Sequence, residues 1–218
     1  IVGRGWGQGP THSQSLHSWF AHIPGLVVVA PSSSQSAFEL YSQALGLNTP
    51  VISIEHRWLH NSTSNFDVLE SLDNPKYKIG SSVVVREGRD ITIVASSFSV
   101  VEALGVAREL QAHQISTEII DVSTLSPLNW EVIVRSTEKT GRVLVLDQGS
   151  RTCGYAAEIM AGLYERVKVP FVMRRLTMPD IPVPTSHELS KFVYPSLRSQ
   201  VEAAAELIGI KIDVRSLS

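Results

Sequence analysis

Short runs of β-branched residues alternate along this chain with longer stretches whose apolar residues recur every three or four positions. The run at 26–30, Leu-Val-Val-Val-Ala, is apolar throughout, which is typical of a strand buried on both faces of a parallel sheet. A helical pattern precedes it at 12–23, another follows from Ala37 to Leu45, and a second apolar run occupies 51–54. This alternation predicts an α/β layer fold.

The same alternation returns in the second part of the chain. Strands are expected at 83–85, 91–95, 117–122, 143–146 and 171–176, and helices at 100–110, 129–136, 156–167 and 197–208. Between the two parts, residues 61–81 are rich in Asn, Ser, Asp, Pro and Gly, which is typical of an interdomain linker. The sequence therefore predicts two α/β units, the second with a mostly parallel sheet.

Composition narrows the classes of function. Lys plus Arg number 19 and Asp plus Glu 21, so the net charge is 19 − 21 = −2. The chain thus lacks the excess of basic residues that is typical of nucleic-acid-binding proteins. The apolar run at 26–30 is far shorter than the roughly 20 residues of a membrane helix. A single cysteine, Cys153, excludes an internal disulfide and a multi-cysteine zinc site. The chain opens with Ile1, without a signal-peptide pattern, which indicates that upstream material was removed or belongs to a longer product.

Three histidines fall in the first helical pattern. His12, His17 and His22 are five positions apart, so each step turns the helix by about 140° and they share no face. We expect no metal site, and we interpret His17 and His22 as solvent or interface residues. His12 differs because it lies where a loop with Gly3, Gly5, Gly7, Gly9 and Pro10 enters a helix. Spacing alone supports a functional role and a capping role for His12 about equally.

Polar residues follow two of the predicted strands. Residues 55–57 (Glu-His-Arg) and 147–149 (Asp-Gln-Gly) stand at strand ends, where α/β sheets collect ligands. A site, an interface and solvated loop charges all fit these positions. Cys153 has no histidine within several residues to act as a base, which argues against a nucleophile. The glycine run is GxGxGxG rather than GxGxxG, and no strand precedes it, so a dinucleotide fingerprint is not supported.

Longer stretches of the sequence are recognisable. Residues 5–15, Gly-Trp-Gly-Gln-Gly-Pro-Thr-His-Ser-Gln-Ser, and residues 20–31, Phe-Ala-His-Ile-Pro-Gly-Leu-Val-Val-Val-Ala-Pro, resemble the β subunit of the thiamine-diphosphate-dependent 2-oxoacid dehydrogenases. These transketolase-like subunits belong to the E1 components of the pyruvate and branched-chain dehydrogenase complexes. The resemblance continues at 50–55, 90–95, 144–149, 151–154, 182–184 and 194–196, and so covers nearly the whole chain.

The resemblance implies a domain layout. Residues 1–75 look like the second part of a pyrimidine-binding (PYR) domain, 76–89 like a linker and first strand, and 90–214 like a transketolase C-terminal domain. Family β subunits are longer at the N-terminus, and that part carries the first PYR strands and the glutamate that contacts the cofactor aminopyrimidine. The fragment should therefore be inactive alone and leave a PYR sheet edge unpaired.

The resemblance also implies site residues. His12 matches the family's active-site histidine, with a role near the thiazolium end in handling protons or orienting the acyl intermediate and the incoming lipoyl group. Ser13 and Gln14 would support it. Thiamine diphosphate and Mg²⁺ would be bound mostly outside this chain, and no cofactor-binding or metal-binding residue is assigned within it. Leu47 stands where an aspartate is usual, which calls the family's K⁺ site into question. Residues 56–60 replace a segment that often ends in tyrosine, and because this loop borders the active-site region, the identity of the substrate is open.

The implied activity is that of an oxidoreductase. The complete enzyme would decarboxylate a 2-oxo acid oxidatively and transfer the acyl group to the disulfide of lipoyl-E2. Its partners would be an E1 α subunit or α-like domain, the E2 lipoyl and subunit-binding domains, and a second copy in an α2β2 assembly, with neither nucleic acid nor membrane. The compartment would be the bacterial cytoplasm or the mitochondrial matrix. The alternatives are a fragment of a transketolase or deoxyxylulose-phosphate synthase, and a non-catalytic assembly module.

Overall fold

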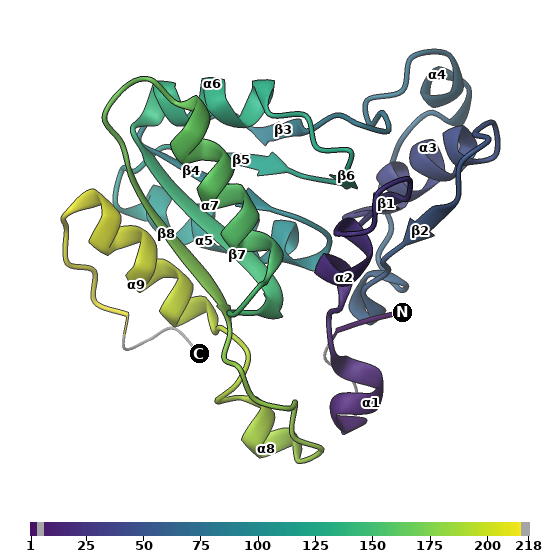
Figure 1. Cartoon of the computed structure of the whole chain (residues 1–218). Coiled ribbons are helices and arrows are strands. Elements are labelled where there is room, and N and C mark those ends of the chain that lie inside the picture. The colour runs from purple at the N-terminus through teal and green to yellow at the C-terminus, as the bar shows by residue number, and fades with distance from the viewer. Residues whose placement is uncertain (4–6, 215–218) are drawn as a thin grey trace.

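Two sheets organise the computed structural model, which describes residues 1–3 and 7–214 (Figure 1). In the smaller sheet, β1 (Val27–Val29) pairs in parallel with β2 (Val51–Ser53) and antiparallel with β6 (Thr124–Ser126). The larger sheet has the order β3-β5-β4-β7-β8. Its strands are β3 (Val83–Arg86), β4 (Ile91–Ala95), β5 (Thr117–Asp121), β7 (Arg142–Ser150) and β8 (Val172–Met178). All its pairings are parallel except that of β3 with β5, so the predicted α/β class with a mostly parallel sheet is confirmed.

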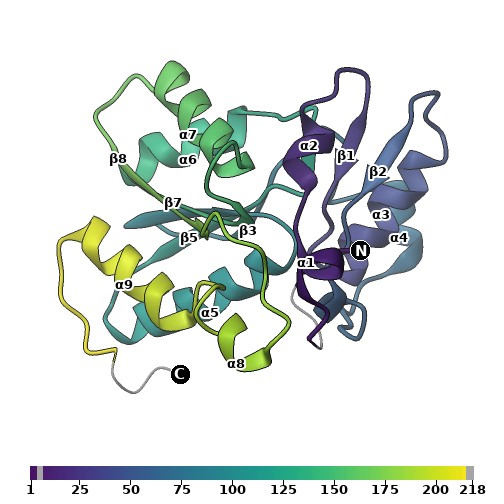
Figure 2. The same ribbon diagram turned by 60° about the horizontal axis from the view of Figure 1, so that its bottom comes forward.

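Helices cover both faces of the larger sheet, as Figure 2 shows. On one face, Ile91 and Ile93 pack with α5 (Phe98–Ala112) and α9 (Leu197–Ile208). On the other, Val94 packs with α6 (Glu131–Thr140) and α7 (Tyr155–Arg166). Because neighbouring residues of β4 point to opposite faces and both faces are covered, all its residues are buried. Four of the five are apolar, and the hydroxyl of the fifth, Thr92, is hydrogen-bonded to the hydroxyls of Ser136 and Thr140.

The first part of the chain also forms helices, of which α2 and α3 pack on the smaller sheet. They are α1 (Gly9–Ser13), α2 (His17–Ala21), α3 (Ser34–Ala44), the 3₁₀ helix η1 (Arg57–Leu59) and α4 (Val68–Asp73). A reciprocal pair of bonds between Ser33 and Ser36 caps the start of α3. A further short helix, α8 (His187–Ser190), lies in the loop after β8. No helix among the described residues is long and apolar enough to span a membrane.

The structure corrects three expectations. The helix expected from His12 to Ile23 is broken into α1 and α2, because Gln14 adopts an extended conformation with ψ 140°. The stretch expected to be a linker contains α4, whose first turn is capped by Asp67. The strand β6 was not expected, since it is three residues long and directly follows β5. Gly5, part of the predicted glycine loop, and Trp6, part of the family motif, lie outside the described residues.

The pairing of β6 joins the two halves of the chain. It supplies a partner on one side of β1, and Ser126 donates to the carbonyl oxygen of Leu26. Among the strands of the described residues, β2 and β6 each pair only with β1, so both are edge strands of the smaller sheet.

Candidate functional site

The His12 loop, defined here as residues 9–16, comprises α1 and the three residues that lead from it to α2 (Figure 2). The path of the backbone into this loop depends on glycine. Gly7 and Gly9 have φ values of 72° and 62°, which residues with an L side chain rarely adopt. A Cβ at Gly9 would lie 2.6 Å from Oγ1 of Thr185, in the loop after β8. The glycines therefore let the backbone ahead of His12 press against the C-terminal half of the chain.

Two side chains from distant parts of the sequence hold the His12 loop by its backbone. Arg57 donates from Nη1 to the carbonyl oxygen of His12 at 2.9 Å. Tyr194 donates its hydroxyl to the carbonyl oxygen of Ser13 at 3.3 Å. Both bonds satisfy carbonyls that a continued helix would have used, which explains why the predicted long helix is interrupted here.

The side chain of His12 is exposed and lines a cavity of about 580 Å³. Most of the other lining residues are apolar: Ile1, Val2, Pro10, Leu16, Phe20, Ile52 and Ile54, joined by Thr11, Gln14 and Ser53. Within residues 1–3 and 7–214, the imidazole makes no hydrogen bond or ion pair. It therefore offers both ring nitrogens to a ligand or to solvent.

The three predicted site residues do not all face the same space. Gln14 shares the His12 cavity and also lines a second cavity of about 300 Å³. Ser13 is buried and lines only that second cavity, beside Gln148 and Asp180. The geometry thus groups His12 with Gln14 and separates Ser13, and the roles of all three stay predictions.

The lining of the His12 cavity bears on thiamine diphosphate. It holds an imidazole and aromatic and aliphatic side chains, but no carboxylate that could bond the aminopyrimidine. Glu55, at the end of β2, is engaged elsewhere: Tyr41 donates its hydroxyl to Oε1 at 2.6 Å, and His60 Nε2 lies 3.1 Å from Oε2. Burial, followed by the bond to Glu55, raises the pKa of Tyr41 to about 12. The described residues alone therefore do not fit the cofactor, and we derive no step through it. The described residues also contain no group of three or more His, Cys, Asp or Glu side chains arranged to hold a metal ion.

His17, which we interpreted as a solvent or interface histidine, is 5% exposed. Its Nε2 lies 2.9 Å from Oδ1 of Asp147, at the end of the pairing of β7 with β4. The solvent interpretation of His17 is wrong. The strand expected at 143–146 continues to Ser150, so Asp147 lies within β7, one residue past its pairing with β4, and not after the strand end as expected. Sequence spacing gave no sign that the two side chains meet.

A second buried carboxylate was missed by the sequence analysis. Asp121, the last residue of β5, is fully buried and accepts a hydrogen bond from the hydroxyl of Ser32. Burial raises the pKa of Asp121 to about 7, although Ser32 and the charge of Lys76 act in the opposite direction. Its place at a strand end was the available signal. It contacts the loop after β1 and so helps to join the two units.

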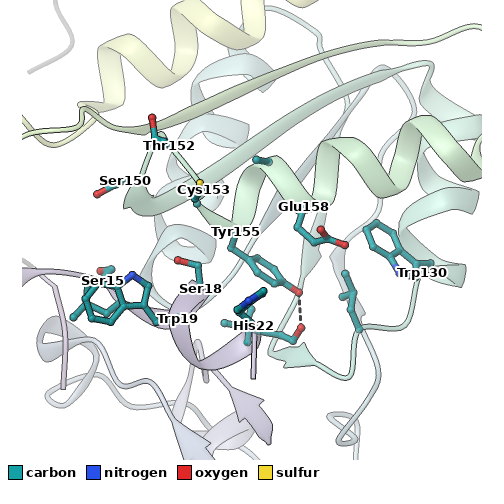
Figure 3. Close-up of a pocket in the computed structure, with 16 residues that line it drawn as sticks. Ser15, Ser18, Trp19, His22, Trp130, Ser150, Thr152, Cys153, Tyr155 and Glu158 are labelled. Carbon is teal, nitrogen blue, oxygen red and sulfur yellow. Dashed lines mark hydrogen bonds between the residues drawn. The ribbon is translucent and has the colours of Figure 1, made fainter. Parts of the chain in front are cut away.

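The largest cavity, about 1010 Å³, lies between α2 and α7 and does not include His12 (Figure 3). Trp19 and His22 line it from the side of α2, and Trp130 and Tyr155 from the opposite side. Tyr155 donates its hydroxyl to the carbonyl oxygen of Leu125 at 2.7 Å. Trp19 is 68% exposed at this cavity, and Cys153 at its rim is also exposed. Because His12 is not among its lining residues, this cavity does not place an acid–base group beside the predicted catalytic residue.

Family models match two successive parts of the chain. Residues 4–62 match the transketolase pyrimidine-binding domain, and residues 80–199 match the transketolase C-terminal domain. A solved structure described as a split-gene transketolase, an inactive β4 tetramer, superposes with a TM-score of 0.76 over 97% of this chain and 66% of that one. At 21% sequence identity, that similarity shows the fold.

Curated relatives are closer in sequence. The β subunit of acetoin:2,6-dichlorophenolindophenol oxidoreductase from Cupriavidus necator is 35% identical over 94% of this chain and 60% of its own length. The mitochondrial β subunit of the pyruvate dehydrogenase E1 component from Saccharomyces cerevisiae is 30% identical over 94% and 57%. These findings confirm the resemblance to E1 β subunits. The chain spans about 60% of the length of the relatives that it matches.

Proposed function

The chain belongs to the family defined by the transketolase C-terminal domain, which matches more than half of it, and on that premise we propose that it is part of a 2-oxoacid dehydrogenase E1 β subunit. In this proposal, residues 1–75 are the second part of a PYR domain, 76–89 the linker and first strand, and 90–214 the C-terminal domain. The complete enzyme decarboxylates a 2-oxo acid and transfers the acyl group to a lipoyl group.

The observation that carries the proposal is the presentation of His12. The motif that resembles the family's active-site loop folds into a short helix whose imidazole faces an open, mainly apolar cavity. Its backbone is fixed by Arg57 and Tyr194, so the ring is held at a defined place while its nitrogens stay available. A positioned imidazole with free nitrogens suits proton transfer near neutral pH.

Each predicted site residue has a distinct task in this proposal. His12 holds or moves a proton at a ring nitrogen that faces the cavity. Gln14, which reaches both cavities, orients a polar group of the substrate or of the incoming lipoyl arm. Ser13 is buried and supports the loop from behind.

The cofactors and partners follow from the same proposal. Thiamine diphosphate would supply the carbanion chemistry of decarboxylation, and it would be held with Mg²⁺ mostly by protein outside this chain. The partners would be an E1 α subunit or α-like domain and the lipoyl and subunit-binding domains of E2, in an α2β2 assembly. We propose a bacterial cytoplasmic or mitochondrial matrix location.

Substrate class separates this proposal from its alternative. Transketolases and deoxyxylulose-phosphate synthases act on sugar phosphates, which call for basic side chains at the site. The described residues that line the His12 cavity include neither lysine nor arginine. The described lining therefore lacks the basic side chains that a phosphate group calls for, which argues against the sugar-phosphate alternative.

The test uses the full-length gene product with its α-type partner, thiamine diphosphate and Mg²⁺, and measures reduction of a dye acceptor by a panel of 2-oxo acids. We expect activity with a 2-oxo acid, at least a hundredfold loss in His12→Ala, and near-normal activity in His22→Ala, which lines the separate large cavity. Unchanged activity in His12→Ala would remove His12 from catalysis. Activity only with sugar phosphates would establish the alternative.

A non-catalytic assembly module is tested separately. The chain alone is titrated with thiamine diphosphate, and its mass in solution is measured by light scattering. We expect no saturable cofactor binding by the chain alone, because its His12 cavity lacks a lining carboxylate. If the full-length protein with its partner also shows neither binding nor activity, the assembly role is the better description.

A further inference from the structure

The larger sheet has a crevice where open α/β sheets usually bind ligands. From β4 the chain crosses to β5 on one side of it, and later returns to β7 on the other side. The carboxyl ends of β4 and β7 therefore lie at a point where the direction of winding reverses, which is the general ligand position in such sheets. The serine-rich segment 96–99 follows β4, and Asp147 lies in β7 one residue past the last residue of β7 that pairs with β4.

This crevice is filled by the first half of the chain. The space left there is only about 20 Å³, room for about one water molecule. Asp147, Gln148 and residues 96–99 line it from the larger sheet. Val2, Ser15, His17 and His56 are among those that line it from the smaller unit. The usual ligand position is therefore occupied by protein, and His17 supplies the only ionisable side chain from α2 that reaches it.

His17 and Asp147 form a polar contact across this crevice. The pair, 2.9 Å apart, is almost completely buried, with side-chain exposures of 7% and 5%. Asp147 also accepts from the backbone N–H of Gly149 at 2.8 Å and of Ala156, in the first turn of α7, at 2.9 Å. A buried carboxylate with these partners is held in one orientation, so it defines where the imidazole must lie.

The position of His17 in the sequence links this contact to the His12 loop. His17 is the first residue of α2, directly after that loop ends. Arg57 and Tyr194 hold the loop at residues 12 and 13. We propose that His17, paired with Asp147, is the positioning residue that seats the C-terminal end of the His12 loop in the switch-point crevice of the larger sheet. Any effect of His17 on catalysis rests on the proposed function of His12. The positioning of the His12 loop by His17 does not depend on that function.

Several other groups face the pair. Tyr155 from α7 lies edge-on to His17, with ring centroids 6.1 Å apart, and His56 lines the same small space from the loop after β2. Gly149 packs closely on the pair, because a Cβ there would lie 3.2 Å from both His17 Cε1 and Asp147 Oδ1, tighter than an ordinary contact. The contact is thus built from β7, α7 and the loop after β2 around one imidazole.

The structural test measures hydrogen exchange of the backbone amides of residues 11–16 in the chain as it stands. We expect His17→Ala and Asp147→Asn to raise exchange in this segment at least tenfold. His17→Gln, whose amide N–H groups offer Asp147 a polar partner in place of the imidazole, should recover part of the protection. His22→Ala, exposed on the same side of the chain, is the matched control and should change nothing.

If His17→Ala fails to fold, the histidine ring ¹⁵N spectra of the wild type and of His17→Gln decide. The proposal is overturned if the ring ¹⁵N shifts of His17 are the same in wild type and in Asp147→Asn. It is also overturned if hydrogen exchange of residues 11–16 is unchanged in His17→Ala. In the complete enzyme, His17→Gln should lower kcat more than it raises KM and retain more activity than His17→Ala. Altered exchange without any enzymatic activity would leave the seating intact and refute the proposed function instead.

Discussion

Nη1 of Arg57 donates to the backbone carbonyl oxygen of His12 across 2.9 Å, and so joins the end of β2 to the loop that carries the predicted catalytic histidine. The bond leaves the imidazole itself unengaged. Arg57 is partly buried, so its guanidinium is less screened than a fully exposed one would be.

Replacing Arg57 should loosen the His12 loop with little effect on the fold. Loss of one charge-assisted bond in Arg57→Ala should lower the free energy of unfolding by about 1 kcal/mol. Exchange of the amides in residues 11–14 should increase, and Arg57→Lys should show a smaller change, since lysine keeps a charged donor. Urea unfolding and hydrogen exchange measure the two effects. Protection equal to wild type in Arg57→Ala would show that Tyr194 alone holds the loop.

The acid limit of stability should depend on Asp147. Burial alone would raise the pKa of this carboxyl, but His17 and the N–H groups of Gly149 and Ala156 outweigh burial and hold the pKa below its ordinary value. A carboxylate whose pKa is depressed by folding stabilises the protein above its unfolded pKa of about 3.9, and this contribution is lost as pH falls through the folded value.

Asp147→Asn should therefore lower the free energy of unfolding by about 3 kcal/mol near neutral pH, because it removes a buried carboxylate that accepts from the N–H groups of Gly149 and Ala156 and faces His17. The difference from wild type should shrink as pH falls below about 4. Urea unfolding of both proteins between pH 3 and 7 measures it. A difference that does not change with pH would mean that Asp147 carries no charge in the folded protein.

Asp121 should affect the pH dependence of stability in the direction opposite to Asp147. Its pKa is raised by burial to about 7 in the folded protein, so the folded state favours the protonated form. The stability that this group contributes is complete below its unfolded pKa of about 3.9 and is lost as pH rises through about 7. Asp121→Asn keeps a neutral group of the same shape, so relative to wild type it should become more stable as pH rises from 4 to 7. Thermal unfolding of both proteins from pH 4 to 7 tests the prediction. The prediction fails if the wild type becomes more stable relative to Asp121→Asn as pH rises.

Gly162 is required by the packing of α7 on Trp130. A Cβ at this position would lie 2.0 Å from Cη2 of Trp130, and Arg166 covers the same ring at 4.5 Å from its centroid. Gly162→Ala should therefore destabilise the chain by about 1–3 kcal/mol, although alanine is the better helix former. Gly46→Ala is the control, because its Cβ would meet nothing closer than 3.6 Å. Equal unfolding midpoints for the two variants would show that Trp130 moves aside freely.

Local patterns in the sequence predicted the layer fold, because buried parallel strands and amphipathic helices each need a particular spacing of apolar residues. The runs at 26–30 and 91–95 became β1 and β4 because both faces of each are buried. The motif around His12 identified the family, and that part of the interpretation was confirmed by the comparisons.

The tertiary structure alone decided how the His12 loop is held. The helix expected at 12–23 breaks at Gln14, where carbonyls are bonded by Arg57 and Tyr194, which are 45 and 181 positions from their acceptors. His17 is buried because Asp147, 130 positions away, meets it in β7, just past the last residue of that strand that pairs with β4. Such contacts leave no local spacing to detect, since they depend on how two separately formed sheets pack together. The sequence by itself determined which strands and helices form and which family they belong to, and the packing of the two units determined which histidine faces a cavity and which is buried beside a carboxylate.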